Sequence, residues 1–247
     1  MPGAVTQIED HKGDHYYDVM KRIHETIDPR SYLEIGTRTG GSLILSKCVS
    51  VAVDPKFHIT SNIIGAKPAC FFYQMTSDRF FKSVDIAPII GGEIDFAFLD
   101  GMHLFEFLLR DFYNTEKLCG KHSIIALHDC LPPDVRYTSR YERDSDIRKD
   151  ASHPHWWAGD VWKVPVILRR MRPDLHIIAL DAPPTGLILV TNLDPASRVL
   201  ENGYRAVVDE FSQLSLESLG LDKLSEELGV ISTAKLKAFE DIASHLS

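Results

Sequence analysis

The sequence predicts an α/β protein with a Rossmann-like, mostly parallel sheet of seven strands and helices on both faces. Short apolar runs alternate with helix-like segments along most of the chain, a pattern typical of a parallel sheet covered by helices. A glycine-rich turn at 36–41 follows the first of these runs, and the last two runs lie close enough together to form an antiparallel hairpin. We expect one domain of this class in 247 residues, followed by extra C-terminal helices.

The first half of the chain contains most of the predicted elements. Apolar residues at helical spacing from Tyr16 to Ile27 predict a lead-in helix over 14–27. Each of five short apolar runs is expected to form a buried parallel strand, at 32–35, 49–53, 70–73, 94–99 and 123–127. The segments between them predict helices over 41–47, 77–84 and 104–118.

The second half completes the sheet and adds helices. We expect Asp160 to cap a helix that runs to about Met171, and the runs at 175–180 and 187–190 to form the terminal hairpin. The domain would therefore cover 1–194. Residues 195–247 read as helices only, with two apolar stripes that include Val199, Leu200, Tyr204, Val207, Val208, Phe211 and Leu214, then Leu236, Phe239, Ile242 and Leu246. We favour their packing on the domain. The alternatives are a dimerisation appendage, through which the protein would form a homo-oligomer, and a substrate-capping appendage.

Composition and charge exclude several functional classes. The formal net charge of −8 argues against nonspecific binding to nucleic acid or to an anionic membrane. No apolar run approaches the roughly 20 residues needed to span a bilayer, and residues 1–13 lack the pattern of a secretory signal. The four cysteines have no C-x-x-C spacing, so we expect mostly buried free thiols of a cytoplasmic protein, not a structural zinc site; they are Cys48, Cys70, Cys119 and Cys130.

The turn after the first strand indicates a nucleoside-bearing cofactor. Glycines let backbone approach the ligand, and Asp54, 18 residues after Gly36, can accept hydrogen bonds from ribose hydroxyls. A dinucleotide fold needs a second glycine where this chain has Arg38, whose side chain would crowd a diphosphate. Glu34 would also repel phosphate but would suit the ammonium of S-adenosylmethionine. We therefore predict this cofactor rather than NAD, the alternative being an ordinary strand–turn–helix. The expected contacts are Glu34, Gly36, Thr37, Gly40, Ser42, Asp54, Thr76, Asp78 and Asp100.

Acidic and histidine side chains follow the fourth and fifth predicted strands. Asp100 ends the fourth, and His128 and Asp129 end the fifth. Because the carboxyl ends of parallel strands meet at one sheet edge, we expect these side chains near the glycine turn. Two carboxylates and an imidazole could hold Mg²⁺, or Mn²⁺ because of the imidazole. The structural alternatives are that Asp100 caps the following helix and that His128 and Asp129 form a buried hydrogen-bonded pair.

The run Phe98-Leu99-Asp100-Gly101-Met102-His103, together with the pair His128-Asp129, resembles class I S-adenosylmethionine-dependent methyltransferases. Over about residues 30–190 the chain is similar to a bacterial group of small-molecule O-methyltransferases. This group is akin to the macrolide-sugar O-methyltransferases and the cephalosporin-hydroxylase-like proteins, and is more distantly similar to catechol O-methyltransferase. The resemblance implies that Asp100 and Asp129 hold a metal. It also implies that His103, in place of a lysine, is the general base. We expect the pKa of this histidine to suit proton removal at neutral pH.

The expected activity is methyl transfer to a hydroxyl of a small molecule of the sugar or phenol type. The alternatives are a metal-dependent hydroxylase or hydrolase that uses the same strand ends, and a noncatalytic binding module. The segment 130–159 shows no convincing periodic element, and a loop of this length in a compact domain is usually functional or disordered. We expect it to form a lid over the acceptor, with Trp156 and Trp157 packing on a ring. Its arginines could hold a carboxylate or phosphate; they are Arg136, Arg140, Arg143 and Arg148.

Overall fold

The computed structural model of the chain describes residues 4–238, 241 and 244. Seven strands form one sheet in the order β3-β2-β1-β4-β5-β7-β6, in which β7 alone runs antiparallel to its neighbours. This confirms the predicted Rossmann-like sheet and its terminal hairpin. The strands are β1 Ser31–Ile35, β2 Val49–Val53, β3 Cys70–Tyr73, β4 Ile94–Leu99, β5 Cys119–His128, β6 His176–Leu180 and β7 Leu187–Thr191.

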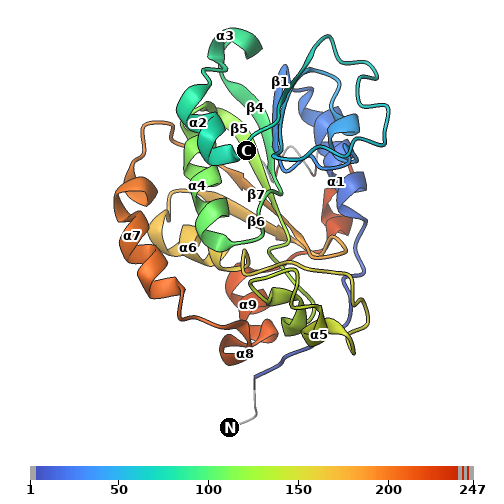
Figure 1. The fold of residues 1–247 in the computed structure, drawn as a ribbon, viewed down its shortest axis with the longest axis vertical. Coiled ribbons are helices and arrows are strands. Elements are labelled where there is room, and N and C mark those ends of the chain that lie inside the picture. The colour runs from blue at the N-terminus through green and yellow to red at the C-terminus, as the bar shows by residue number, and fades with distance from the viewer. Residues whose placement is uncertain (1–3, 239–240, 242–243, 245–247) are drawn as a thin grey trace.

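Helices cover both faces of this sheet (Figure 1). One face packs mainly against α2, α4, α6 and α7, and the opposite face packs against α1. The inner strands are apolar on both faces because both are buried. The helices are α1 Tyr16–Ile27, α2 Ser77–Ser83, α3 Ala87–Ile90, α4 Phe105–Glu116, α5 Ser145–Arg148, α6 Lys163–Met171, α7 Val199–Phe211, α8 Leu216–Leu219 and α9 Leu221–Leu228.

Three predicted elements differ from the structure. The helix expected over 41–47 is only a 3-10 turn, Leu43–Leu45, because glycines 40 and 41 delay its start and Ser46 is already extended. The strand expected over 123–127 begins earlier, at Cys119, with a register irregularity against β4. The segment 130–159 contains the 3-10 turn Val135–Thr138 and the short helix α5.

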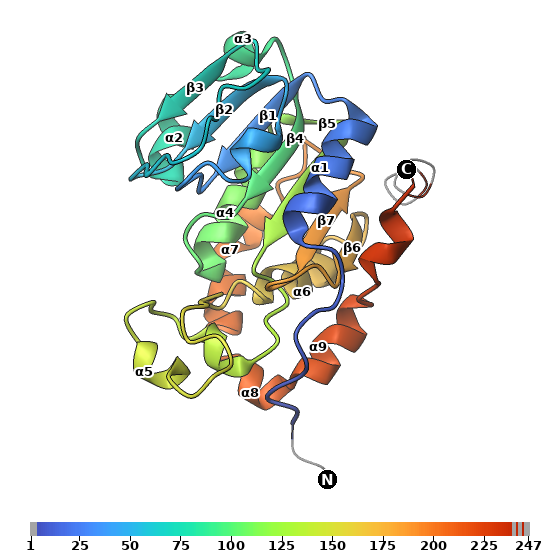
Figure 2. The ribbon, with the colours of Figure 1, turned by 90° about the vertical axis from the view of Figure 1, so that its right-hand side faces the viewer.

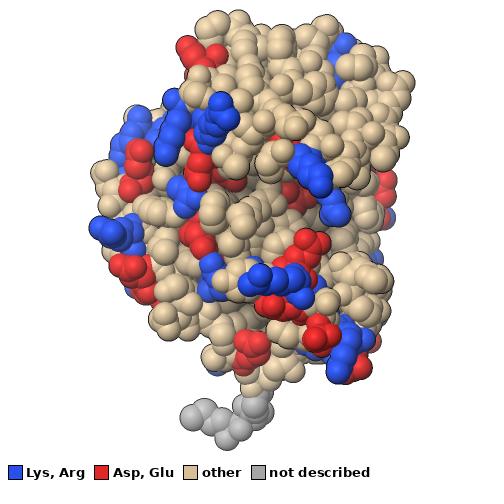
Figure 3. Space-filling model, in the orientation of Figure 1, with Lys and Arg blue, Asp and Glu red and all other residues tan. Residues whose placement is uncertain are grey.

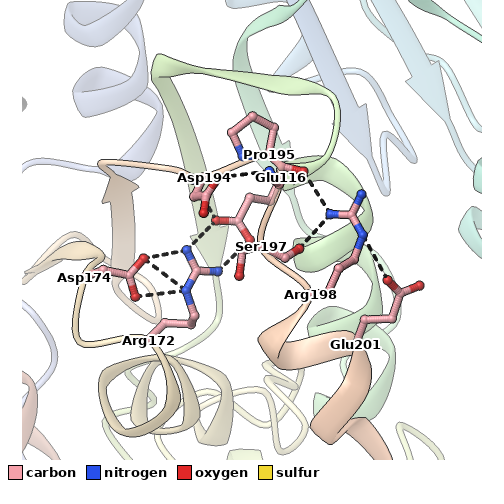
Figure 4. Close-up of polar contacts among 9 residues, drawn as sticks. Glu116, Arg172, Asp174, Asp194, Pro195, Ser197, Arg198 and Glu201 are labelled. Carbon is pink, nitrogen blue, oxygen red and sulfur yellow. Dashed lines mark hydrogen bonds and ion pairs between the residues drawn. The ribbon is translucent and has the colours of Figure 1, made fainter.

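The C-terminal helices pack on the domain. Leu200, Val207 and Phe211 of α7 belong to the same core as the apolar face of α4. Beside them, the buried carboxylate of Glu116 accepts two hydrogen bonds from Arg172, at 2.8 and 2.9 Å, and one from the backbone N–H of Asp194 (Figure 4). Of the second predicted stripe, Leu236 is buried, whereas Phe239, Ile242 and Leu246 lie outside the described residues.

The N-terminal segment before α1 runs as a strap along the loop that follows β5 (Figure 2). The backbone N–H of Ile8 donates to Pro133, and that of Val135 donates to Thr6. The carbonyl of Val5 accepts a hydrogen bond from Leu221 at the start of α9. The strap therefore joins the loop after β5 to the C-terminal helices, an arrangement that no sequence pattern predicted.

The surface and the cysteines agree with the character expected from composition. Acidic and basic side chains are interspersed on the face seen in Figure 3, so this face presents no continuous basic surface. No helix in the described part of the chain is long and apolar enough to cross a membrane. All four cysteines are free thiols, and all but Cys70 are buried.

Candidate functional site

A cavity of about 730 Å³ opens at the carboxyl ends of β1, β2 and β4. This is the edge where ligands bind in open α/β sheets, and the volume lies in the range of small-molecule sites. The strand order reverses between β1 and β4, so the loops that follow them separate and leave this space. Seven of the predicted cofactor contacts line it, namely Gly36, Thr37, Ser42, Asp54, Thr76, Asp78 and Asp100. The structure thus brings together residues that are far apart in the sequence.

Position 36 requires glycine because the turn after β1 and the loop after β4 approach closely there. Its φ is +90°, and a Cβ added there would lie 2.0 Å from the carbonyl oxygen of Asp100. The neighbouring backbone is held by hydrogen bonds from Gly36 to Val53, at 2.8 Å, and from Asp100 to Ile35, at 2.9 Å. A side chain at position 36 would therefore separate the glycine turn from the start of the Asp100 loop.

Asp54 holds the glycine turn by its backbone. Its two carboxylate oxygens accept hydrogen bonds from the N–H groups of Arg38 and Lys56, at 2.8 and 2.7 Å. Each oxygen retains a further lone pair, which a ribose hydroxyl in the cavity could use. Arg38 has a φ of +45°, and its side chain lines the cavity without an ion pair in the described part of the chain.

The far end of the cavity is formed by the start of α2. The Thr76 side chain caps that helix by accepting the N–H of Arg79. Asp78 lines the cavity, but Arg110 binds its carboxylate through two hydrogen bonds of 2.8 Å and holds its pKa below the usual range. The carboxylate is therefore engaged within the protein. Asp111, which the sequence did not single out, is buried nearby, and burial raises its pKa to about 7.

Two predicted contacts, Glu34 and Gly40, do not line the cavity. Glu34 is fully buried within β1, and its Oε2 accepts a hydrogen bond of 2.6 Å from the hydroxyl of Tyr32. Burial raises the pKa of Glu34 to about 7. Its second oxygen has no hydrogen-bond partner among the described residues. Glu34 thus lies behind the cavity wall, and Gly40 instead packs against the side chain of Ile63.

Two acids and two histidines gather where β4 and β5 end. His103 Nε2 lies 3.5 Å from Asp100 Oδ1 and 3.2 Å from Asp129 Oδ2. His128 Nδ1 lies 3.4 and 3.5 Å from the same two atoms. Asp129 adopts a φ of +60°, and its other oxygen accepts a hydrogen bond from the hydroxyl of Thr185. The cluster joins the cavity through Asp100 and His103, which line it.

Electrostatics in this cluster favour charged histidines. Burial alone would lower the pKa of His103, but the charges of Asp129 and Asp100 outweigh it and raise that pKa to about 9. The same balance raises the pKa of His128 to about 10. Despite its burial, the pKa of Asp129 is held well below its usual range by the two histidines. The pKa of His103 therefore lies above the neutral range that we predicted.

Asp100 does not cap the helix that follows it, α4. The N–H of Phe105, at the first residue of α4, donates to Asp160 at 3.0 Å, so the helix is capped by Asp160 and not by Asp100. Our prediction that Asp160 caps α6 is wrong, because that helix begins at Lys163 and its N-cap residue is Trp162. Neither ring nitrogen of His128 has a hydrogen-bond partner among the described residues, although the ring packs on Tyr16, with ring centres 4.0 Å apart.

The donor atoms fit a divalent cation. Asp100, His103 and Asp129 each offer one ligand atom, and these atoms lie within 4.8 Å of one another. Asp100 Oδ1 is buried without a hydrogen-bond partner in the described part of the chain. Two carboxylates and an imidazole suit Mg²⁺ or Mn²⁺. His103 thus joins the carboxylates in this group. The predicted third ligand, His128, is 6% exposed, and its Nδ1 lies at similar distances from the same two oxygens, so its role as a ligand stays a prediction.

The loop after β5 forms one wall of the cavity through Trp157 and Glu142. Its arginines, which we expected to bind an acceptor carboxylate, do not line the cavity and bind the protein instead. Arg136 pairs with Asp134, Arg140 with Glu106 and Asp160, and Arg148 donates to Ser139 and to the carbonyl of Glu142, while Arg143 stacks over Tyr141. Trp156 packs on His153 away from the cavity.

Several residues of the site were missed by sequence reasoning. Tyr16 and Tyr17 of α1 line the cavity, as does Met102, which is 53% exposed. Thr185 reaches Asp129 because β7 pairs with β5 and brings the hairpin turn to this edge. The only available signal was the position of Met102 inside the Asp100–His103 run. Nothing local in the sequence indicates the roles of the tyrosines or of Thr185.

The sequence matches no family model, and no curated protein is similar to it in sequence. Solved structures share the fold. TomG, an O-methyltransferase from Streptomyces achromogenes in complex with SAM, is 14% identical, with a TM-score of 0.50 over 72% of this chain and 80% of that chain. An O-methyltransferase from Bacillus cereus in complex with SAH is 15% identical, with a TM-score of 0.50 over 73% and 82%. A putative caffeoyl-CoA O-methyltransferase from Staphylococcus aureus is 15% identical, with a TM-score of 0.50 over 76% and 86%.

Proposed function

We propose that the protein is an S-adenosylmethionine-dependent O-methyltransferase that acts on a small molecule. The observation that carries this proposal is a single cavity that joins two kinds of side chain. One end has the glycine turn, Asp54 and the start of α2, and the other has Asp100 and His103. The first set suits a nucleoside, and the second suits activation of a hydroxyl. The complexes of TomG with SAM and of the Bacillus cereus enzyme with SAH have this fold, which supports the choice of cofactor.

The cavity suggests one orientation of the cofactor. Asp54 would accept the ribose hydroxyls through its free lone pairs, and Thr76 and Ser77 would lie along the adenine. The methionine part would lie over Gly36 and Thr37, with the buried carboxylate of Glu34 beneath. Arg38 and Lys56 are cations that line this end, and Arg38 would meet the methionine carboxylate. The same arginine takes the position at which a dinucleotide needs glycine, which argues against NAD.

The acid–histidine cluster would prepare the acceptor. With a cation held by Asp100 and Asp129 and not by His103, the imidazole would take the proton from the acceptor hydroxyl at Nε2, the nitrogen that faces the two carboxylates. S-adenosylmethionine, when bound, supplies the methyl group, and a divalent cation on Asp100 and Asp129 would lower the pKa of the acceptor hydroxyl. Neutralisation of these carboxylates would also remove the charges that raise the pKa of His103. Trp157 and Met102 would exclude water from the acceptor.

The cavity walls beside the acid–histidine cluster support one class of acceptor. Tyr16 packs on His128 and Trp157 stacks on His103, Glu142 also lines the cavity, and the arginines of the loop are engaged elsewhere. A sugar or a phenol fits such walls better than an anionic acceptor does. The Asp100–His103 run and the His128-Asp129 pair support placement in the bacterial group akin to the macrolide-sugar O-methyltransferases. A hydroxylase or hydrolase would leave the ribose-binding features without a use.

Calorimetry with S-adenosylhomocysteine tests the proposal. We expect one-to-one binding to the whole chain, and Asp54→Asn to weaken it about 10- to 100-fold, since a hydrogen bond to a charged group contributes about 1.5–3 kcal/mol. Asp85→Asn is a matched control, because Asp85 is exposed and also accepts a backbone N–H, but lies outside the cavity. No heat at millimolar ligand, or tighter binding of NAD, would contradict the proposal.

A further inference from the structure

The segment from Trp157 to Asp160 surrounds His103 on the side opposite to the carboxylates. The carbonyl oxygen of Trp157 lies 2.8 Å from His103 Nδ1, and the Trp157 ring stacks on the imidazole with the ring centres 4.9 Å apart and an angle of 26°. The N–H of Asp160 donates to the carbonyl of His103 at 3.2 Å. These contacts hold the ring plane, one ring nitrogen and the backbone of the same residue.

Gly159 makes this close fit feasible. Its φ is +61°, and a Cβ added there would lie 1.7 Å from the carbonyl oxygen of His103 and 2.8 Å from its Cβ. Any side chain at position 159 would therefore push the loop and His103 apart. Gly65 has a similar φ of +47°, but a Cβ there would meet nothing within 4 Å. The two glycines share the conformation and differ in the contact.

The segment itself is anchored. Asp160 is buried and binds Lys163 at 3.0 Å, Arg140, and the N–H of Phe105. The N–H groups of residues 158 and 159 donate to the carbonyl of Tyr137, at 2.9 and 3.1 Å. The segment therefore holds His103 against a fixed support and does not follow it as a loose loop would.

We propose that Trp157 and Gly159 are positioning residues that make Nε2 the reactive nitrogen of His103. A carbonyl oxygen can only accept, so Nδ1 must carry a proton in this contact. The lone pair that remains for a proton or a cation is then on Nε2, which faces Asp100 and Asp129. Histidine ligands and bases commonly have the second nitrogen held in this way. The inference rests on the proposed function for its catalytic meaning but not for its geometry.

Imidazole proton spectra of the ¹⁵N-labelled whole chain test the geometry without any acceptor. We expect an Nδ1–H signal that exchanges slowly with water and that His103→Gln removes, which assigns it. Gly159→Ala should abolish the slow exchange, and Gly65→Ala, the matched control, should preserve it. Absence of the signal from the unmodified protein, or its survival in Gly159→Ala, would overturn the proposal. The first of these results requires no variant to fold.

Kinetics test the catalytic meaning. We expect Gly159→Ala to lower kcat about 100-fold, the usual order for an ångström-scale displacement, with little change in KM for S-adenosylmethionine. Trp157→Ala should lower kcat, and Trp157→Phe, which keeps a ring and the same carbonyl, should restore most of it. Equal losses in the two Trp157 variants would contradict the role of the stack. If S-adenosylhomocysteine fails to bind while the Nδ1–H signal is present, the proposed function fails and the positioning of His103 stands.

Discussion

His103 is subject to two opposing requirements on its protonation state. A general base must be neutral to accept a proton, yet the carboxylates of Asp100 and Asp129 raise its pKa to about 9 against the opposing effect of burial. At neutral pH the raised pKa values of His103 and His128 favour their protonated forms beside Asp129, whose pKa is lowered. A divalent cation on the carboxylates would offset their charge and release His103.

The pH dependence of the reaction follows from this pKa. Because the active form of His103 is the neutral one and its pKa is raised, kcat/KM without added metal should increase with pH from 7 and level off near 9. With Mn²⁺ the rise should move to lower pH. His103→Gln should remove the dependence and lower kcat about 10²- to 10⁴-fold. The check is kcat/KM between pH 6 and 10; a rate that falls over this range would show that His103 acts as an acid.

At the residue scale, the sequence predicted which side chains meet better than what each one does. Asp54, Asp100 and Asp129 follow strands, and a parallel sheet places such residues at one edge regardless of detail. The partners of each carboxylate depend on loops that no periodicity describes. Arg110 donates a hydrogen bond to Asp78, and Thr185 donates one to Asp129. Both contacts join residues that are 32 or more positions apart in the sequence.

At the scale of elements, the N-terminus of α4 shows how a distant loop serves a helix. Asp160 accepts the N–H of Phe105, 55 residues away, and binds the side chain of Lys163, which is 3% exposed. Lys163 in turn lies over the ring of Phe105, 4.7 Å from its centre. One carboxylate therefore joins α4, α6 and the segment that holds His103.

Removal of this carboxylate should be costly. Asp160→Ala leaves Lys163 buried without its partner and should lower the free energy of unfolding by about 3–5 kcal/mol. Asp160→Asn keeps an acceptor for the N–H of Phe105 and should cost less. Adding Lys163→Met to Asp160→Ala should recover part of the loss, because it removes the unpaired charge. Urea unfolding measures all four proteins; a loss of under about 0.5 kcal/mol in Asp160→Ala, the range of ordinary surface changes, would contradict this account.

Elements with long apolar periodicity were predictable, and short ones were not. The apolar faces of α1 and α4 and the buried strands are dictated by burial, which sequence spacing records directly. The turn Leu43–Leu45 and the helix α5 span 3 and 4 residues, too few to show a period. The function of Asp160 could not be predicted because its nearest helix in sequence, α6, is not the one that it caps.

At the scale of the whole molecule, the C-terminal helices are continuous with the Rossmann-like domain. Apolar residues of α7, α8 and α9 share a core with α4 and α6, and the Glu116–Arg172 pair fastens the loop before α7 (Figure 4). The apolar residues buried by this packing are among those that, in the alternative prediction, would form a dimer interface. An oligomer through these helices stays a prediction.

One cavity unites the glycine turn after β1 with Asp100 and His103, which follow β4, so the position of its ligand tests the proposed function of the whole molecule. The most direct measurement is a crystal structure of the protein with S-adenosylhomocysteine and Mn²⁺. We predict the ribose hydroxyls on Asp54, the sulfur directed toward His103 Nε2, and metal density between Asp100 and Asp129. A ligand whose sulfur points away from this cluster, or metal density elsewhere, would contradict the account.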